Sequence, residues 1–207
     1  MSPKLNPTIR TYDKIAKHYF ERRKDRSAIG HHLARFVQMI EAYQLAGLPV
    51  IDIGCGPGFD AAEMRTQGLH CIGLDLSSGM LETARQYYPN SYLMADMLDL
   101  PIKQAVGGLW CCASLLHLPR IDMPKALDEF YRVLVPGGVL YLSVKRGKGQ
   151  KWSTASDGKP GARLFTLWEP AVVDGLIEGA GFQIIHSTSE ISQEETTWLA
   201  RFAIRSL

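Results

Sequence analysis

The stretch PVIDIGCGPGFD, residues 49–60, decides how the rest of this chain folds. Val50, Ile51 and Ile53 are branched and apolar, which is typical of a strand covered on both faces. Asp52 interrupts them, and a buried carboxylate is costly unless it has partners. Glycine then recurs at every second position, which lets a ligand approach the main chain and the first amides of the next helix. The stretch therefore predicts a strand, a glycine turn that binds a ligand, and a helix.

The spacing of the glycines bears on which ligand binds. A dinucleotide fingerprint reads G-x-G-x-x-G, and its third glycine would fall at Phe59, so NAD is disfavoured. G-x-G-x-G after an acidic strand end resembles motif I of the class I S-adenosylmethionine (SAM) methyltransferases. The resemblance implies that the loop packs against the ribose and the methionine tail, and that the cofactor site includes Asp52, Gly54, Cys55, Gly56 and Gly58. The loop alone leaves SAM, NAD and a turn without a ligand open.

Composition places the chain among ordinary globular proteins. Its 207 residues fit one domain, 1–207, and its net charge of +2 gives no overall attraction to nucleic acid or to membranes. The N-terminus lacks the apolar core of a signal peptide, and no apolar run is long enough to span a bilayer. The four cysteines show no C-x-x-C spacing, so neither a metal site nor a disulfide framework is indicated. We expect a cytoplasmic monomer or homodimer with reduced thiols.

The N-terminal segment is expected to form a helix that covers the site. Apolar and aromatic residues recur at helical spacing over residues 9–24. YDKIAKHYF resembles the Y-D-x-x-A-x-x-Y opening of many small-molecule SAM methyltransferases, which implies a lid over residues 1–28, with Tyr19 near the cofactor and Tyr12 on the substrate side. Both tyrosines also fit as packing residues. The charged run at residues 21–26 is interpreted as a solvated face.

An acid ends the second predicted strand, CIGLD. Asp75 closes a β-α-β unit about twenty residues after the glycine turn, where a carboxylate accepts hydrogen bonds from both ribose hydroxyls. NAD and SAM both carry that diol. A helix N-cap is the other interpretation, although the serines that follow can cap that helix themselves. GLDLSSGMLETAR also resembles motif II of the same family, which implies that Leu76 flanks the adenine and that Met80 belongs to the cofactor site.

A second acid favours SAM over NAD. The segment MADMLDLP resembles the family's x-x-D-x-x-x-L-P, in which the aspartate takes the adenine amino group. The resemblance gives this role to Asp96, with Met97 beside it, and leaves Asp99 as a loop or capping acid. Dehydrogenases seldom need such an acid.

The segment GGLWCCASLLHLPR predicts a fourth strand beside the first, at the switch point where ligand and substrate meet. The resemblance places Ala113 and Ser114 under the methionine moiety. His117, in an L-x-H-L segment, fits as a general base, a capping residue or an adenosine-side residue. Transfer from a sulfonium is an in-line displacement that depends mainly on alignment, so a base is needed only for an acceptor that is protonated at working pH.

Residues 146–163 are the most polar stretch and are predicted to form a flexible loop. In related enzymes a segment here, residues 146–165, helps to enclose the acceptor. That resemblance makes Trp152, Arg163 and Phe165 substrate-side candidates. A mobile surface loop without acceptor contact is the alternative.

Strand and helix patterns alternate along the chain, which predicts an α/β fold. The resemblance covers residues 12–205 and implies a doubly wound, mostly parallel seven-stranded sheet with an antiparallel last strand. Helices would cover both faces, giving three α/β/α layers.

The sequence as a whole predicts a SAM-dependent methyltransferase that acts on a small molecule and releases S-adenosylhomocysteine. The attacking atom, oxygen, nitrogen or carbon, stays open. ASLLH stands where amino-directed DNA methyltransferases carry D/N-P-P-Y/F, which disfavours nucleic acid. The alternatives are a SAM-binding regulatory or scaffold protein without catalysis, an RNA or protein methyltransferase that uses the basic segments, and an NAD-dependent oxidoreductase.

Overall fold

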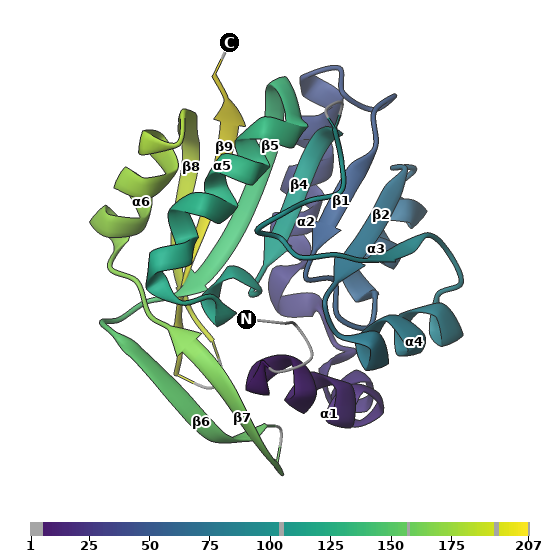
Figure 1. The fold of residues 1–207 in the computed structure, drawn as a ribbon. Coiled ribbons are helices and arrows are strands. Elements are labelled where there is room, and N and C mark those ends of the chain that lie inside the picture. The colour runs from purple at the N-terminus through teal and green to yellow at the C-terminus, as the bar shows by residue number, and fades with distance from the viewer. Residues whose placement is uncertain (1–5, 104–105, 157, 193–194, 207) are drawn as a thin grey trace.

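A computed structural model describes residues 6–103, 106–156, 158–192 and 195–206. Its centre is a seven-stranded sheet in the order β3-β2-β1-β4-β5-β9-β8 (Figure 1). Neighbours from β3 to β5 pair in parallel, and β9 runs antiparallel between β5 and β8. These strands are β1 (Val50–Ile53), β2 (Cys71–Asp75), β3 (Tyr92–Met94), β4 (Val106–Cys112), β5 (Leu134–Lys145), β8 (Phe182–Ile191) and β9 (Thr197–Arg205). The predicted doubly wound sheet with an antiparallel last strand is confirmed.

Helices cover both faces of the sheet. One core cluster joins the sheet to α5 and α6, and a second joins it to α2, α3 and α4. The helices are α1 (Pro7–Arg23), α2 (Ser27–Ala42), α3 (Phe59–Thr66), α4 (Ser78–Tyr87), α5 (Met123–Val133) and α6 (Pro170–Gly179). Within the described residues, none of the helices combines the length and the apolar character that crossing a bilayer requires.

The first strand forms as predicted because the sheet surrounds it. All four residues of β1 are buried, between β2 on one side and β4 on the other. Their carboxyl ends therefore lie together, and the turns that follow β1 and β4 meet at the switch point of the sheet.

The loop predicted at residues 146–163 is wrong. The chain instead forms an antiparallel hairpin of β6 (Gln150–Ser156) and β7 (Lys159–Thr166), which Figure 1 shows beside α1. The cause is tertiary, because β7 bonds to α1: Thr11 Oγ1 donates to the Ala162 carbonyl, and the Leu164 amide donates to Thr8 Oγ1. The many glycines and lysines of the stretch indicate a loop. The apolar end of β7 is short, and its residues Leu164 and Phe165 are buried.

Candidate functional site

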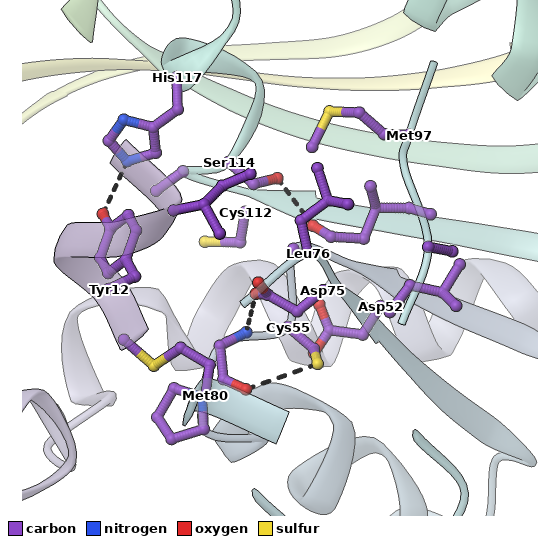
Figure 2. A pocket seen from close by; sticks show the side chains of 18 of the residues that line it. Tyr12, Asp52, Cys55, Asp75, Leu76, Met80, Met97, Cys112, Ser114 and His117 are labelled. Atoms are coloured by element: carbon purple, nitrogen blue, oxygen red, sulfur yellow. Dashed lines mark hydrogen bonds between the residues drawn. The ribbon is translucent and has the colours of Figure 1, made fainter. Parts of the chain in front are cut away.

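A cavity of about 1130 Å³, its open mouth included, lies at the carboxyl edge of the sheet where β1 and β4 end. Most of the predicted site residues line it, and Figure 2 shows many of their side chains around it. They are Tyr12, Tyr19, Asp52, Gly54, Cys55, Gly56, Asp75, Leu76, Met80, Asp96, Met97, Ala113, Ser114 and His117. Gly58, Trp152, Arg163 and Phe165 lie outside its lining.

The three glycines of the turn differ in the space that a side chain would have. At Gly54, a Cβ atom would lie 2.4 Å from the Ser114 Cβ, so glycine lets the turns after β1 and β4 pack together. At Gly56, which has a φ of +53°, an added Cβ would meet nothing within 4 Å and would project into open space. At Gly58 it would strike the Tyr92 hydroxyl at 2.5 Å. Gly56 therefore leaves room for a ligand, whereas Gly54 and Gly58 serve packing.

Asp75, at the end of the neighbouring strand β2, is hydrogen-bonded to the glycine turn. One carboxylate oxygen accepts the Gly56 amide at 2.8 Å (Figure 2). The other accepts the Ser77 amide at 2.8 Å. Burial raises the pKa of Asp75, and the two amide bonds oppose that rise. Ser77 itself caps α4 by accepting the Met80 amide, so Asp75 is not needed as that cap. Its carboxylate remains part of the cavity wall.

A partly buried ion pair lies behind the turn, and sequence reasoning missed it. Arg26 donates from Nε and Nη2 to the two Asp60 oxygens at 2.8 and 2.7 Å, and Trp110 Nε1 donates to the same carboxylate at 2.9 Å. Arg26 and Asp60 both line the cavity. The interpretation of residues 21–26 as a solvated face is therefore wrong at its last position. Nothing in the local sequence marks Arg26, because its partner comes from α3.

Asp52 carries a buried carboxylate oxygen that lacks a partner. Its Oδ2 makes no hydrogen bond within the described residues, although the side chain is only 2% exposed. Burial and the charge of Asp60 raise the pKa of Asp52, and Arg26 opposes them. An unpaired acceptor in a cavity wall is costly unless a ligand donor meets it. Asp52 is therefore a candidate to accept a hydrogen bond from a cationic or N–H group of a ligand in the cavity.

Part of the cavity wall is apolar. Leu76, Met80 and Met97 belong to the lining, as does Asp96, whose Oδ1 accepts the Leu98 amide at 2.9 Å. Apolar walls around one carboxylate suit a flat heterocycle that offers an N–H donor.

Tyr12 and His117 meet at the acceptor side predicted for the site. The Tyr12 hydroxyl lies 2.7 Å from His117 Nε2 (Figure 2), and His117 Nδ1 lies 2.7 Å from the Leu164 carbonyl oxygen. A carbonyl can only accept, so Nδ1 carries the proton and Nε2 accepts from the Tyr12 hydroxyl. Arg163 donates to the same hydroxyl at 3.2 Å.

This pairing changes what His117 can do. Burial lowers the pKa of His117 to about 4, so the ring is neutral at pH 7, and both of its nitrogens are engaged. Burial also raises the pKa of Tyr12, which keeps the phenol protonated. His117 is therefore a poor general base as the site stands. It orients the Tyr12 hydroxyl instead.

Two of the remaining substrate-side candidates, Phe165 and Arg163, pack against this pair, and Trp152 does not. Phe165 lies 5.0 Å from the His117 ring between centroids, and the Arg163 guanidinium lies 5.5 Å from the Tyr12 ring centroid. Trp152 is 53% exposed on β6. Burial raises the pKa of the Cys112 thiol to about 11, so this cavity cysteine is no thiolate nucleophile.

Comparison with known proteins places these features in context. Residues 51–142 match the family model described as a methyltransferase domain. A curated relative, the malonyl-[acyl-carrier protein] O-methyltransferase of Yersinia pestis, is 33% identical over 147 residues, which are 68% of this chain and 53% of that protein. The chain thus spans about half the length of that relative.

Two solved structures share the fold. A SAM-dependent methyltransferase from Methanosarcina mazei aligns with a TM-score of 0.72 at 16% identity, covering 82% of this chain and 97% of that one. The 1,6-didemethyltoxoflavin-N1-methyltransferase of Burkholderia thailandensis, with bound S-adenosylhomocysteine, aligns with a TM-score of 0.68 at 16% identity, covering 94% and 87%. At such identities the likeness shows the fold.

Proposed function

Because residues 51–142 are a methyltransferase domain within the class I SAM-dependent methyltransferase fold, we propose that this chain transfers a methyl group from SAM to a small molecule. The observation that carries the proposal is the unpaired Asp52 carboxylate oxygen, which lies in the same cavity as Asp75 and Asp96. SAM offers a donor for each of them: an ammonium, a ribose diol and an adenine amino group.

The residues fit the cofactor along the whole cavity. Asp52 would take the ammonium, Gly56 would leave space for the tail and ribose, and Asp75 would accept the ribose hydroxyls. Asp96 would accept the adenine amino group between apolar walls. Bound SAM supplies a methyl group on a positively charged sulfur. Carboxylates in the cavity wall complement a ligand that carries an ammonium and a sulfonium.

The acceptor end favours a nucleophile that is already deprotonated. His117 is neutral and engaged on both nitrogens, so the site offers no free base there. Arg163 lies behind Tyr12, and its Nε is buried without a hydrogen bond within the described residues. A nearby guanidinium lowers the energy of an anion, and a carboxylate is ionised at neutral pH without any base. We therefore assign the acceptor to the carboxylates, with Tyr12 as a residue of the wall that positions it.

The curated relative supports this choice of chemistry. Its name describes O-methylation of a malonyl group on an acyl-carrier protein. Such a malonyl group has a free carboxylate, which matches the anionic acceptor inferred from Arg163 and His117. Under the proposal, α1 is the lid expected for residues 1–28, and the β6–β7 hairpin over residues 146–165 forms the outer wall on the acceptor side.

The test measures S-adenosylhomocysteine release from SAM with two matched acceptors: a malonyl group on an acyl-carrier protein, and the same group with its carboxylate blocked as the methyl ester. Turnover of the free carboxylate alone supports the assignment. Turnover of phenols or amines, with no carboxylate methylated, would move the acceptor to another class.

Calorimetry tests the cofactor separately. We expect S-adenosylhomocysteine to bind and NAD not to bind. Binding of NAD without S-adenosylhomocysteine would overturn the methyltransferase assignment. S-adenosylhomocysteine binding without turnover of any acceptor in a broad metabolite pool would favour a scaffold that has lost catalysis.

A further inference from the structure

A cluster of metal-binding side chains lies between α2 and the edge strand β8, apart from the cavity. His31 Nε2 and His32 Nε2 lie 3.2 and 3.3 Å from the same Glu190 oxygen. One ligand atom of each of the three residues lies within 4.8 Å of the others. His31 and Glu190 are 159 positions apart in the chain, and none of the three lines the cavity. The fold has therefore brought two imidazoles and a carboxylate together from distant segments.

We propose that His31, His32 and Glu190 bind one divalent transition-metal ion of the zinc class, which ties α2 to β8. Imidazole nitrogen and carboxylate oxygen are the ligands that zinc takes in proteins, at about 2.0–2.2 Å. In a tetrahedron with bonds of that length, neighbouring ligand atoms lie about 3.4 Å apart. The two distances from the histidine Nε2 atoms to the Glu190 oxygen, 3.2 and 3.3 Å, are close to this ligand–ligand distance.

Packing fixes the position of His32. This residue is 5% exposed and packs against the rings of Tyr141 and Phe202. The cluster thus holds two ring nitrogens and one carboxylate oxygen within 4.8 Å of one another.

A third histidine lies on the same strand. His186 is four residues before Glu190 on the same face of β8, about 13 Å further along the strand, and is not part of the three-residue cluster. Its ring is near Phe202, which His32 also contacts. Arg35, whose guanidinium lies over the Phe202 ring, carries a positive charge that opposes a bound cation nearby.

The competing explanation is that the histidines simply donate hydrogen bonds to Glu190. Calorimetric titration of ZnCl₂ into the full chain distinguishes metal binding from hydrogen bonding alone. We expect one ion per chain, with affinity at least 10-fold weaker in His31→Asn and in Glu190→Gln. His31 is exposed and Glu190 is on an edge strand, so both variants should stay folded. His70→Asn is the matched control, because His70 lies beside β2, and four strands separate β2 from β8.

Cobalt(II) gives an independent readout. Bound by nitrogen and oxygen, it shows visible d–d bands without the near-ultraviolet charge-transfer band of a thiolate ligand. Those bands, lost in His31→Asn and kept in His70→Asn, would support the site. Absence of saturable binding, equal binding by all variants, or a thiolate band from the cysteines would overturn it.

Discussion

The neutral state assigned to His117 makes the stability of the fold sensitive to acid. The pKa of this ring is about 4 in the folded chain because of burial, against an ordinary value of 6.5. Between those two values the unfolded chain binds a proton that the folded chain does not bind. Stability therefore falls as pH falls from about 6.5 towards 4, and the full contribution is present above 6.5.

The size of the effect follows from the same two values. Lowering the pH from 7 to 5 should reduce the free energy of unfolding by about 2 kcal/mol through His117 alone. Urea unfolding of the wild type and of His117→Gln at both pH values isolates this contribution, because groups common to both proteins cancel in the difference. Tyr12→Phe is the matched control: it keeps a buried His117 and should keep the acid sensitivity.

The outcome bears directly on catalysis. If His117→Gln loses as much stability as the wild type between pH 7 and pH 5, the ring is not held neutral. His117 would then regain its place as a candidate base, and the argument for an acceptor that is already ionised would fail.

Four further substitutions test the site. Asp75→Asn should weaken S-adenosylhomocysteine binding by about 1–3 kcal/mol in calorimetry, and unchanged affinity in a folded variant would remove Asp75 from the ribose role. Gly56→Val should abolish that binding with a near-native circular dichroism spectrum, because its side chain enters open space. Tyr12→Phe should lower kcat about 10-fold with little change in KM; a change in KM alone would contradict a positioning role. Asp60→Asn should cost about 2 kcal/mol in urea unfolding, since it leaves the partly buried Arg26 guanidinium without its carboxylate; an unchanged midpoint would refute that.

The parts of the fold that sequence predicts well are those where local pattern and final environment agree. The strand Val50–Ile53 and the helix Phe59–Thr66 form as the stretch at residues 49–60 predicts, because apolar residues define the strand and glycines define the turn between them. The acids at the strand ends lie in one cavity for a similar reason. Parallel strands bring their carboxyl ends to one edge, so Asp52 and Asp75 meet there.

The failures come from contacts between distant segments. The hairpin over residues 150–166 exists because β7 bonds to α1, and its own composition is that of a loop. Arg26 belongs to a charged run that looks solvated, and only the fold supplies Asp60. His117 is a plausible base by type, but the Leu164 carbonyl and the Tyr12 hydroxyl decide its tautomer and its proton.

The bonds of α1 have a consequence for the rate at which ligands enter. This helix is bonded to the rest of the fold on two sides. On one side, Asp13 accepts hydrogen bonds from Ser77 and Gly79. On the other, Thr11 bonds to Ala162 and Tyr12 bonds to His117. If these bonds favour the closed position by a net 3 kcal/mol, the open state is populated about once in 150. The association rate of S-adenosylhomocysteine, measured by stopped flow, should then be about a hundredfold lower than in a chain that lacks these bonds. Release of product, rather than methyl transfer, should be the rate-limiting step of turnover.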